Sequence, residues 1–86
     1  MNSTHYTHYS QVRFADVPKF VLVQVQTMLD REGEWSDDKD DHPTKYGIRQ
    51  QTADIAGYRG NLRDLTITDA AKIWILHWYY LSLIHI

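Results

Sequence analysis

The sequence predicts a mainly α fold of the α+β type, in which two main helices flank a short polar loop or hairpin. Apolar residues recur at helical spacing over residues 16–32 and again over residues 67–80. Residues 34–45 between them are polar, which indicates a loop with possible short hairpin character. The chain has 86 residues, enough for one small domain whose core is near the lower limit for independent stability.

Residues 1–15 are predicted to form a flexible polar tail, because chain termini are usually poorly ordered. This segment lacks a basic start followed by an apolar run, so we expect no signal peptide. Its paired His-Tyr steps, His5–Tyr6 and His8–Tyr9, leave metal binding open as an alternative.

The first main helix is predicted to follow Asp16, whose side chain can cap it, with Pro18 in the first turn. Its apolar stripe persists for more than three turns, which favours a helix over the strand that alternating valines would allow. Continuing the stripe places Glu32 on the buried side, and Gly33 directly after it is a plausible helix stop. The stripe consists of Val17, Phe20, Val21, Val25, Met28 and Leu29.

The second half of the chain is predicted to contain a short helix and a long one. The short helix covers Gln50–Ala56 and ends at Gly57, whereas the long helix covers Ile67–Tyr80. Thr66, followed three residues later by Asp69, resembles a capping box with a shorter acid. The apolar run over residues 73–86 is too short to span a bilayer, so we expect no membrane insertion. The predicted buried face of the long helix is Ile67, Ala70, Ala71, Trp74 and Trp78.

The last six residues, LSLIHI, resemble one translated frame of the mosaic-end adapter used in transposase-based sequencing libraries. We therefore expect residues 81–86 to be a sequencing artefact and the natural chain to be cut off near Tyr80.

Composition and charge exclude several classes of function. A net charge of -2 gives no reason to expect nucleic-acid binding, and the absence of cysteine excludes disulfides and thiolate metal sites. Six of the eleven acids lie within residues 31–41, but no register there has the glycine and glutamate of a calcium loop. No metal site is therefore expected. These acids are Glu32, Glu34, Asp37, Asp38, Asp40 and Asp41.

Two of these carboxylates have the environments that glycosidic bond cleavage needs. The reaction uses a protonated carboxyl beside the leaving oxygen and a second, ionised group. Glu32 at an apolar helix end would be desolvated, which disfavours its charged form and keeps a proton available. Asp41, nine residues later in a polar loop, should stay ionised. By spacing alone this signal is weak, because any loop rich in aspartate offers such a pair.

The stretch EGEWSDDKDDHPTKYGI, residues 32–48, resembles the N-terminal signature of glycoside hydrolase family 108, which comprises phage and bacterial muramidases with a lysozyme-like fold. A later stretch, LTITDAAKIWILHWYY, is similar to a helix of the same family, so the similarity covers about residues 17–80. The positions that match the signature are Glu32, Gly33, Trp35, Asp41, Thr44, Tyr46, Gly47 and Ile48.

The resemblance implies that residues 16–80 are the N-terminal part of a lysozyme-like muramidase domain, an incomplete fold. It implies hydrolysis of the β-1,4 bond between N-acetylmuramic acid and N-acetylglucosamine, with Glu32 as the acid. Asp41 would orient a water or stabilise the developing positive charge, and Thr44 would help to hold that water. Trp35 and Tyr46 are candidates for stacking on sugar rings, with core or hinge packing equally open for each.

The resemblance also implies the biological setting. The partner would be peptidoglycan glycan strands, with no cofactor and no nucleic acid. The chain would act as a monomeric endolysin, cytoplasmic until holin-assisted release to the periplasm and cell wall.

Three departures from the signature keep a second function open. Glu34 replaces a glycine, the Gly-Gly pair before Thr44 is missing, and the loop is about two residues shorter, which weakens the roles of Asp41 and Thr44. The alternative is a non-catalytic peptidoglycan-binding or interaction domain derived from a muramidase.

Overall fold

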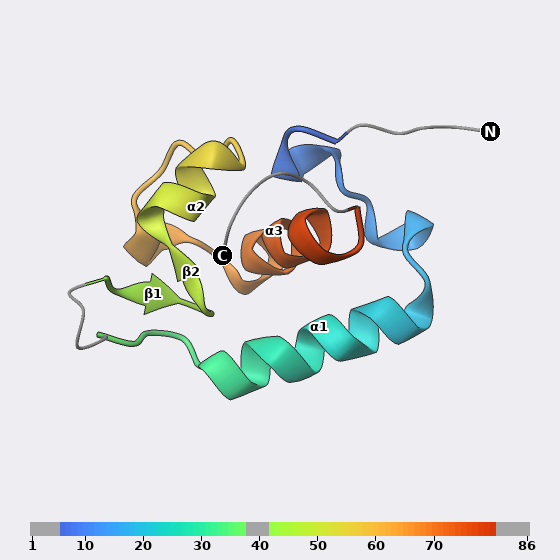
Figure 1. Cartoon of the computed structure of the whole chain (residues 1–86), viewed down its shortest axis with the longest axis horizontal. Coiled ribbons are helices and arrows are strands. Elements are labelled where there is room, and N and C mark those ends of the chain that lie inside the picture. The colour runs from blue at the N-terminus through green and yellow to red at the C-terminus, as the bar shows by residue number, and fades with distance from the viewer. Residues whose placement is uncertain (1–5, 38–41, 81–86) are drawn as a thin grey trace.

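The computed structural model describes residues 6–37 and 42–80, and it confirms a mainly α fold with one small hairpin (Figure 1). In Figure 1, α1 runs along one long edge beside α3, while the hairpin and α2 lie near the end of α1. In chain order the elements are η1 (Tyr9–Gln11), η2 (Phe14–Asp16), α1 (Lys19–Glu32), β1 (Thr44–Lys45), β2 (Ile48–Arg49), α2 (Gln50–Ile55), η3 (Leu62–Asp64) and α3 (Ile67–Trp78).

Helix α1 begins at Lys19 with Pro18 at the N-cap, so the prediction that Asp16 caps it is wrong. Asp16 instead ends the 3₁₀ turn η2 and pairs with Arg13 at 3.9 Å. The predicted apolar stripe is confirmed at Val17, Val21, Val25 and Leu29, which are buried. It is wrong at Phe20, whose side chain is 66% exposed, because neighbouring residues lie about 100° apart around a helix and Phe20 is turned away from the buried valines.

The prediction of a flexible tail is wrong for the described part of residues 1–15. Val12 is fully buried, and the Tyr9 N–H donates to the Ala56 carbonyl at 2.9 Å. A local capping box supports this turn: the His8 ring accepts from the Ser10 N–H at 3.1 Å, and the Gln11 side chain accepts from the His8 N–H at 2.9 Å. Val12 therefore belongs to the core, and Tyr6 and Tyr9 pack against it.

The hairpin pairs β1 with β2 in antiparallel register, Thr44 opposite Arg49 and Lys45 opposite Ile48. The two residues that join the strands, Tyr46 and Gly47, have φ values of 54° and 81°. Positive φ at both central positions is what a type I′ turn requires. The predicted short helix that follows the hairpin is confirmed as α2.

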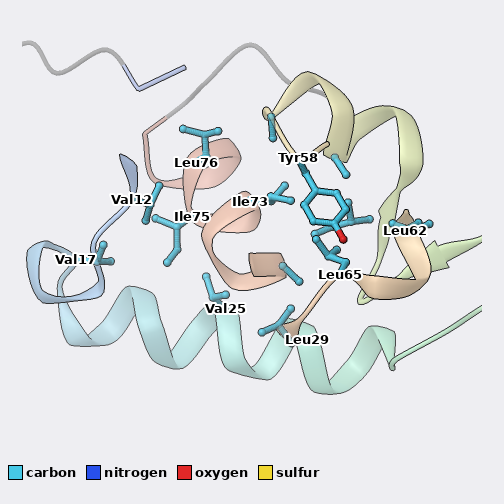
Figure 2. Packing of buried hydrophobic residues seen from close by; sticks show 14 of the residues in the cluster. Val12, Val17, Val25, Leu29, Tyr58, Leu62, Leu65, Ile73, Ile75 and Leu76 are labelled. Atoms are coloured by element: carbon cyan, nitrogen blue, oxygen red, sulfur yellow. The ribbon is translucent and has the colours of Figure 1, made fainter. Parts of the chain in front are cut away.

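Helix α3 is the centre of the core, as Figure 2 shows, and it buries more than one stripe. Its N-cap is confirmed, because the Thr66 hydroxyl accepts from the Asp69 N–H at 3.0 Å. The predicted buried face is wrong at both ends, where Ile67 is 43% and Trp78 is 40% exposed. The helix packs against α1 and also against η1, so residues outside the predicted stripe are buried instead. These are Ile73, Ile75 and Leu76.

Two sets of predictions lie outside the described residues: those on residues 81–86 and those on the loop at residues 38–41, which contains Asp41. In the two described ranges, no helix combines the length and apolar character needed to cross a membrane.

Candidate active site

Glu32 is the last residue of α1, and its side chain stands against the turn of the hairpin. A Cβ placed on Gly47 would lie 2.8 Å from the Glu32 Cγ and 3.2 Å from the Glu32 Cβ. The space beside the Gly47 Cα therefore admits the hydrogen of glycine but no larger side chain. The Glu32 side chain is nevertheless exposed, which contradicts its predicted place on the buried side. The helix stops at Gly33, whose φ of 77° and ψ of 167° turn the chain away before another turn can cover Glu32.

The hairpin is fixed to the segment that follows Glu32 by backbone hydrogen bonds. The Tyr46 N–H donates to the carbonyls of Gly33, at 3.0 Å, and Glu34, at 3.2 Å. Ser36 and Thr44 exchange both of their backbone hydrogen bonds at 2.9 Å. These bonds bring the predicted site residues Thr44 and Tyr46 alongside residues 33–36.

Trp74 of α3 holds the turn from the core side. Its indole N–H donates to the Tyr46 carbonyl at 2.8 Å, and its Cζ2 would lie 3.0 Å from a Cβ on Gly47. Glu32 and Trp74 therefore both meet Gly47, one from α1 and one from α3. From the sequence Trp74 is expected only in the core, and its link to the hairpin is not predicted. A half-buried indole N–H usually finds an acceptor, which is the signal that could have indicated it.

Trp35 is half-buried against the core, and the Arg63 guanidinium lies over its ring at 4.1 Å from the centroid. The Lys45 ammonium donates to the Arg63 carbonyl, which fastens η3 to the hairpin. One face of the indole is thus covered by Arg63 rather than open to a sugar ring. Sequence reasoning missed Arg63, because it comes 28 residues after Trp35 and carries no motif.

The structure therefore brings Glu32, Trp35, Thr44 and Tyr46 to one end of the molecule. Asp41, the predicted second carboxylate, lies outside the described residues. Within the described ranges, no three His, Asp or Glu side chains form a group that could hold a metal ion.

Glu32 lines neither of two hollows found in the described part of the chain. A polar hollow of about 360 Å³ beside the hairpin is lined by His42, Pro43, Arg49, Gln50, Gln51 and Asp54. An apolar groove of about 260 Å³ is lined by α1, α3 and Phe14.

The raised pKa values that the structure shows belong to tyrosines away from the predicted site residues. Burial raises the pKa of Tyr9 and of Tyr58, each assisted by nearby carboxylates. Burial, together with a hydrogen bond to Tyr6, raises the pKa of Tyr80 to about 12. Because each of these tyrosines resists deprotonation in the fold, their raised pKa values bear on the stability of the fold at alkaline pH rather than on catalysis.

Comparison with known proteins supports a family assignment. The family model described as Glycosyl hydrolase 108 matches residues 25–85, which include Glu32, the hairpin, α2 and α3. No significant match is found among curated proteins.

Proposed function

Because this chain belongs to the glycosyl hydrolase 108 family, we propose that it is a muramidase that cleaves peptidoglycan. The bond would be the β-1,4 linkage between N-acetylmuramic acid and N-acetylglucosamine. The observation that carries this proposal is the position of Glu32, inside the matched range, at the end of α1 against the Tyr46–Gly47 turn.

In the proposed reaction, Glu32 donates its proton to the glycosidic oxygen as the bond from that oxygen to the sugar C1 breaks. The sugar passes through an oxocarbenium-like state, and a water adds its hydroxyl to C1 while its remaining proton passes to solvent, from which Glu32 regains its proton. Asp41 orients that water or stabilises the positive charge, and Thr44 helps to hold it. A saccharide that covers Glu32 would replace its water and so favour the protonated form that the reaction needs.

Trp35 and Tyr46 complete the proposed site as the residues that border the saccharide. Both are half-buried and packed against the core, so they present rigid edges to a ligand. Rigid side chains lose little conformational entropy when a ligand binds, which is the usual advantage of aromatic residues at binding sites.

The test is the substitution Glu32→Gln, which keeps shape and removes the acid. General acid catalysis typically contributes about 10²–10⁴-fold, so the release of reducing ends from cell walls should fall at least 100-fold. Glu34→Gln is the matched control, since Glu34 is also an exposed carboxyl and lies two residues further on. Both variants should keep the wild-type Tm. Unchanged lysis by Glu32→Gln would end the proposal.

A non-catalytic peptidoglycan-binding domain is the second candidate, and the exposure of Glu32 favours it, because an acid catalyst is usually desolvated. Binding to purified peptidoglycan without release of reducing ends by the wild-type chain would select this candidate.

We also propose an endolysin-like role, with holin-assisted passage to the cell wall. Expression in bacteria with and without a co-expressed holin tests it. Lysis that needs both proteins supports the role, and equal growth of both cultures contradicts it.

A further inference from the structure

We infer that Arg63, whose guanidinium lies over the Trp35 ring, is the group that recognises a carboxylate of the substrate. This inference rests on the proposed function and names the chemical feature of the glycan that the site selects. The lactyl carboxyl of N-acetylmuramic acid is a free carboxylate in stem-free glycan. Where a stem peptide is attached, that carboxyl forms an amide with the stem, and the stem itself carries the carboxylates. A neutral polymer of N-acetylglucosamine carries none.

Three hydrogen bonds fix the main chain at Arg63 and the preceding Leu62. Its N–H donates to the Asn61 side-chain oxygen at 2.9 Å, which caps η3. Its carbonyl accepts from the Lys45 ammonium of the hairpin. The preceding N–H, of Leu62, donates to the Gln50 side chain at 2.8 Å. The base of the Arg63 side chain therefore has a defined position relative to β1.

The side chain is also positioned, because its guanidinium lies 4.1 Å from the centroid of the Trp35 ring. A guanidinium stacked on an aromatic face keeps its N–H donors in its own plane, where they remain free to bind. A carboxylate accepts two such parallel bonds, the strongest and most directional ion pair of proteins. Since the stack orders the long side chain in advance, less entropy is lost when the ligand binds.

The positive charge of Arg63 is unmatched among the described residues. The one pairing of a Lys or Arg with a carboxylate within 4.0 Å in residues 6–37 and 42–80 is that of Arg13 with Asp16. Nearby acids in sequence, Glu34 and Asp64, do not reach it at that distance. A permanently charged, exposed and oriented guanidinium is therefore open to an external anion.

The location places this cation within reach of a sugar bound at Glu32. Trp35 follows Glu32 by three residues, so their Cα atoms are at most about 11 Å apart. The Arg63 guanidinium covers the Trp35 ring, so we expect one glycan strand to contact both Glu32 and Arg63. Arg63 would then bind the acidic sugar next to the cleaved bond, rather than the indole binding a sugar face.

The experiment measures binding to the full chain carrying Glu32→Gln, so that no ligand is consumed. The three ligands are a stem-free glycan with free lactyl carboxylates, a muropeptide with stems, and a neutral N-acetylglucosamine oligomer. Arg63→Gln should raise Kd for the acidic ligands about tenfold or more, and for the neutral oligomer less than about twofold. Arg63→Lys should give Kd values for the acidic ligands between those of the wild type and Arg63→Gln, since lysine keeps the positive charge but cannot donate two parallel hydrogen bonds.

The matched control is Arg59→Gln, because Arg59 is an exposed arginine four residues away whose guanidinium donates to the Asp54 carbonyl at 3.2 Å. It should leave all three Kd values unchanged. If Arg63→Gln weakens binding of the stem-free glycan, Arg63 recognises the lactyl carboxylate. If it weakens binding of the muropeptide alone, Arg63 recognises a carboxylate of the stem. An independent arm uses no Arg63 variant: converting the lactyl carboxyl to its amide should weaken binding by a similar factor.

Equal effects of Arg63→Gln on acidic and neutral ligands, or no effect on either, would overturn the inference. If the wild type cuts glycan and Glu32→Gln does not, that result leaves the proposed function standing. If the wild-type chain neither binds nor cuts any of the three ligands, both the inference and the proposed function fail.

Discussion

Replacing Gly47 with alanine should violate two constraints at the hairpin turn. The first is the backbone, because an L-residue in the left-handed region costs about 1–2 kcal/mol. The second is space, because the new Cβ would lie 2.8 Å from the Glu32 Cγ and 3.0 Å from the Trp74 Cζ2. Overpacking of this kind costs about 1–3 kcal/mol.

The sum predicts that Gly47→Ala lowers the free energy of unfolding by about 2–5 kcal/mol. At about 0.05–0.15 kcal/mol per residue, an 86-residue chain has about 4–13 kcal/mol in total, so the loss is large. Urea unfolding followed by tryptophan fluorescence measures it, at a temperature near 15 °C where small domains are most stable.

A double-mutant cycle then isolates the contact. Glu32→Ala alone should change stability by less than about 0.5 kcal/mol, since the side chain is exposed. In the Gly47→Ala background the same change removes the nearest atom and should restore about 0.5–1 kcal/mol. Gly33→Ala is the backbone control: its φ is 77°, but a Cβ there meets nothing within 4 Å, so its effect should add to that of Glu32→Ala. A cost under about 1 kcal/mol for Gly47→Ala, or strict additivity with Glu32→Ala, would refute the reasoning.

Three further predictions concern the core. Val12→Ala should lower the free energy of unfolding by about 2 kcal/mol, because Val12 is fully buried. Urea unfolding measures this change, and a value below about 0.5 kcal/mol would indicate that the segment around Val12 is a flexible tail. Trp74→Phe should cost about 1–3 kcal/mol, because the Tyr46 carbonyl loses its donor, and the amide signals of the hairpin should shift in an NMR spectrum; unshifted signals would contradict the link. The pKa of Tyr80 is raised from 10.0 in the unfolded chain to about 12 in the fold, so the protonated Tyr80 hydroxyl stabilises the fold. This contribution is complete below pH 10 and is lost as the pH rises through about 12. Unfolding followed by circular dichroism should begin in that window, and Tyr80→Phe should reduce the pH dependence there; an identical profile would exclude Tyr80 as the cause.

The elements that could be predicted from the sequence are those whose signals are local. The period of the valines in α1, the Thr66 cap and the glycine after α2 each act within a few residues, and each prediction holds. Exposure was harder to predict, because it depends on which partner covers a face. Phe20 fits the stripe by spacing, yet α3 does not reach it.

At the candidate site, the residue types were predictable but their surroundings were not. Glu32 and the Tyr46–Gly47 turn came from the motif, whereas the exposure of Glu32 follows from the sharp exit of the chain at Gly33. The links from Trp74 to Tyr46 and from Arg63 to Trp35 each join residues 28 positions apart. A single sequence has no local pattern that indicates such pairs.

The burial of Val12 and Val25 against α3 has a consequence for how the chain folds during synthesis. The partner of both segments is made last among the described elements, since Ile73 to Leu76 come some fifty to sixty residues after them. Until α3 emerges from the ribosome, the apolar face of α1 and Val12 lack the helix that buries them. Contacts between distant segments are slow to form, because the intervening chain must be closed into a loop. We therefore expect a nascent chain that stays open, and exposed to chaperones and proteases, until α3 is complete and folds the whole molecule in one step.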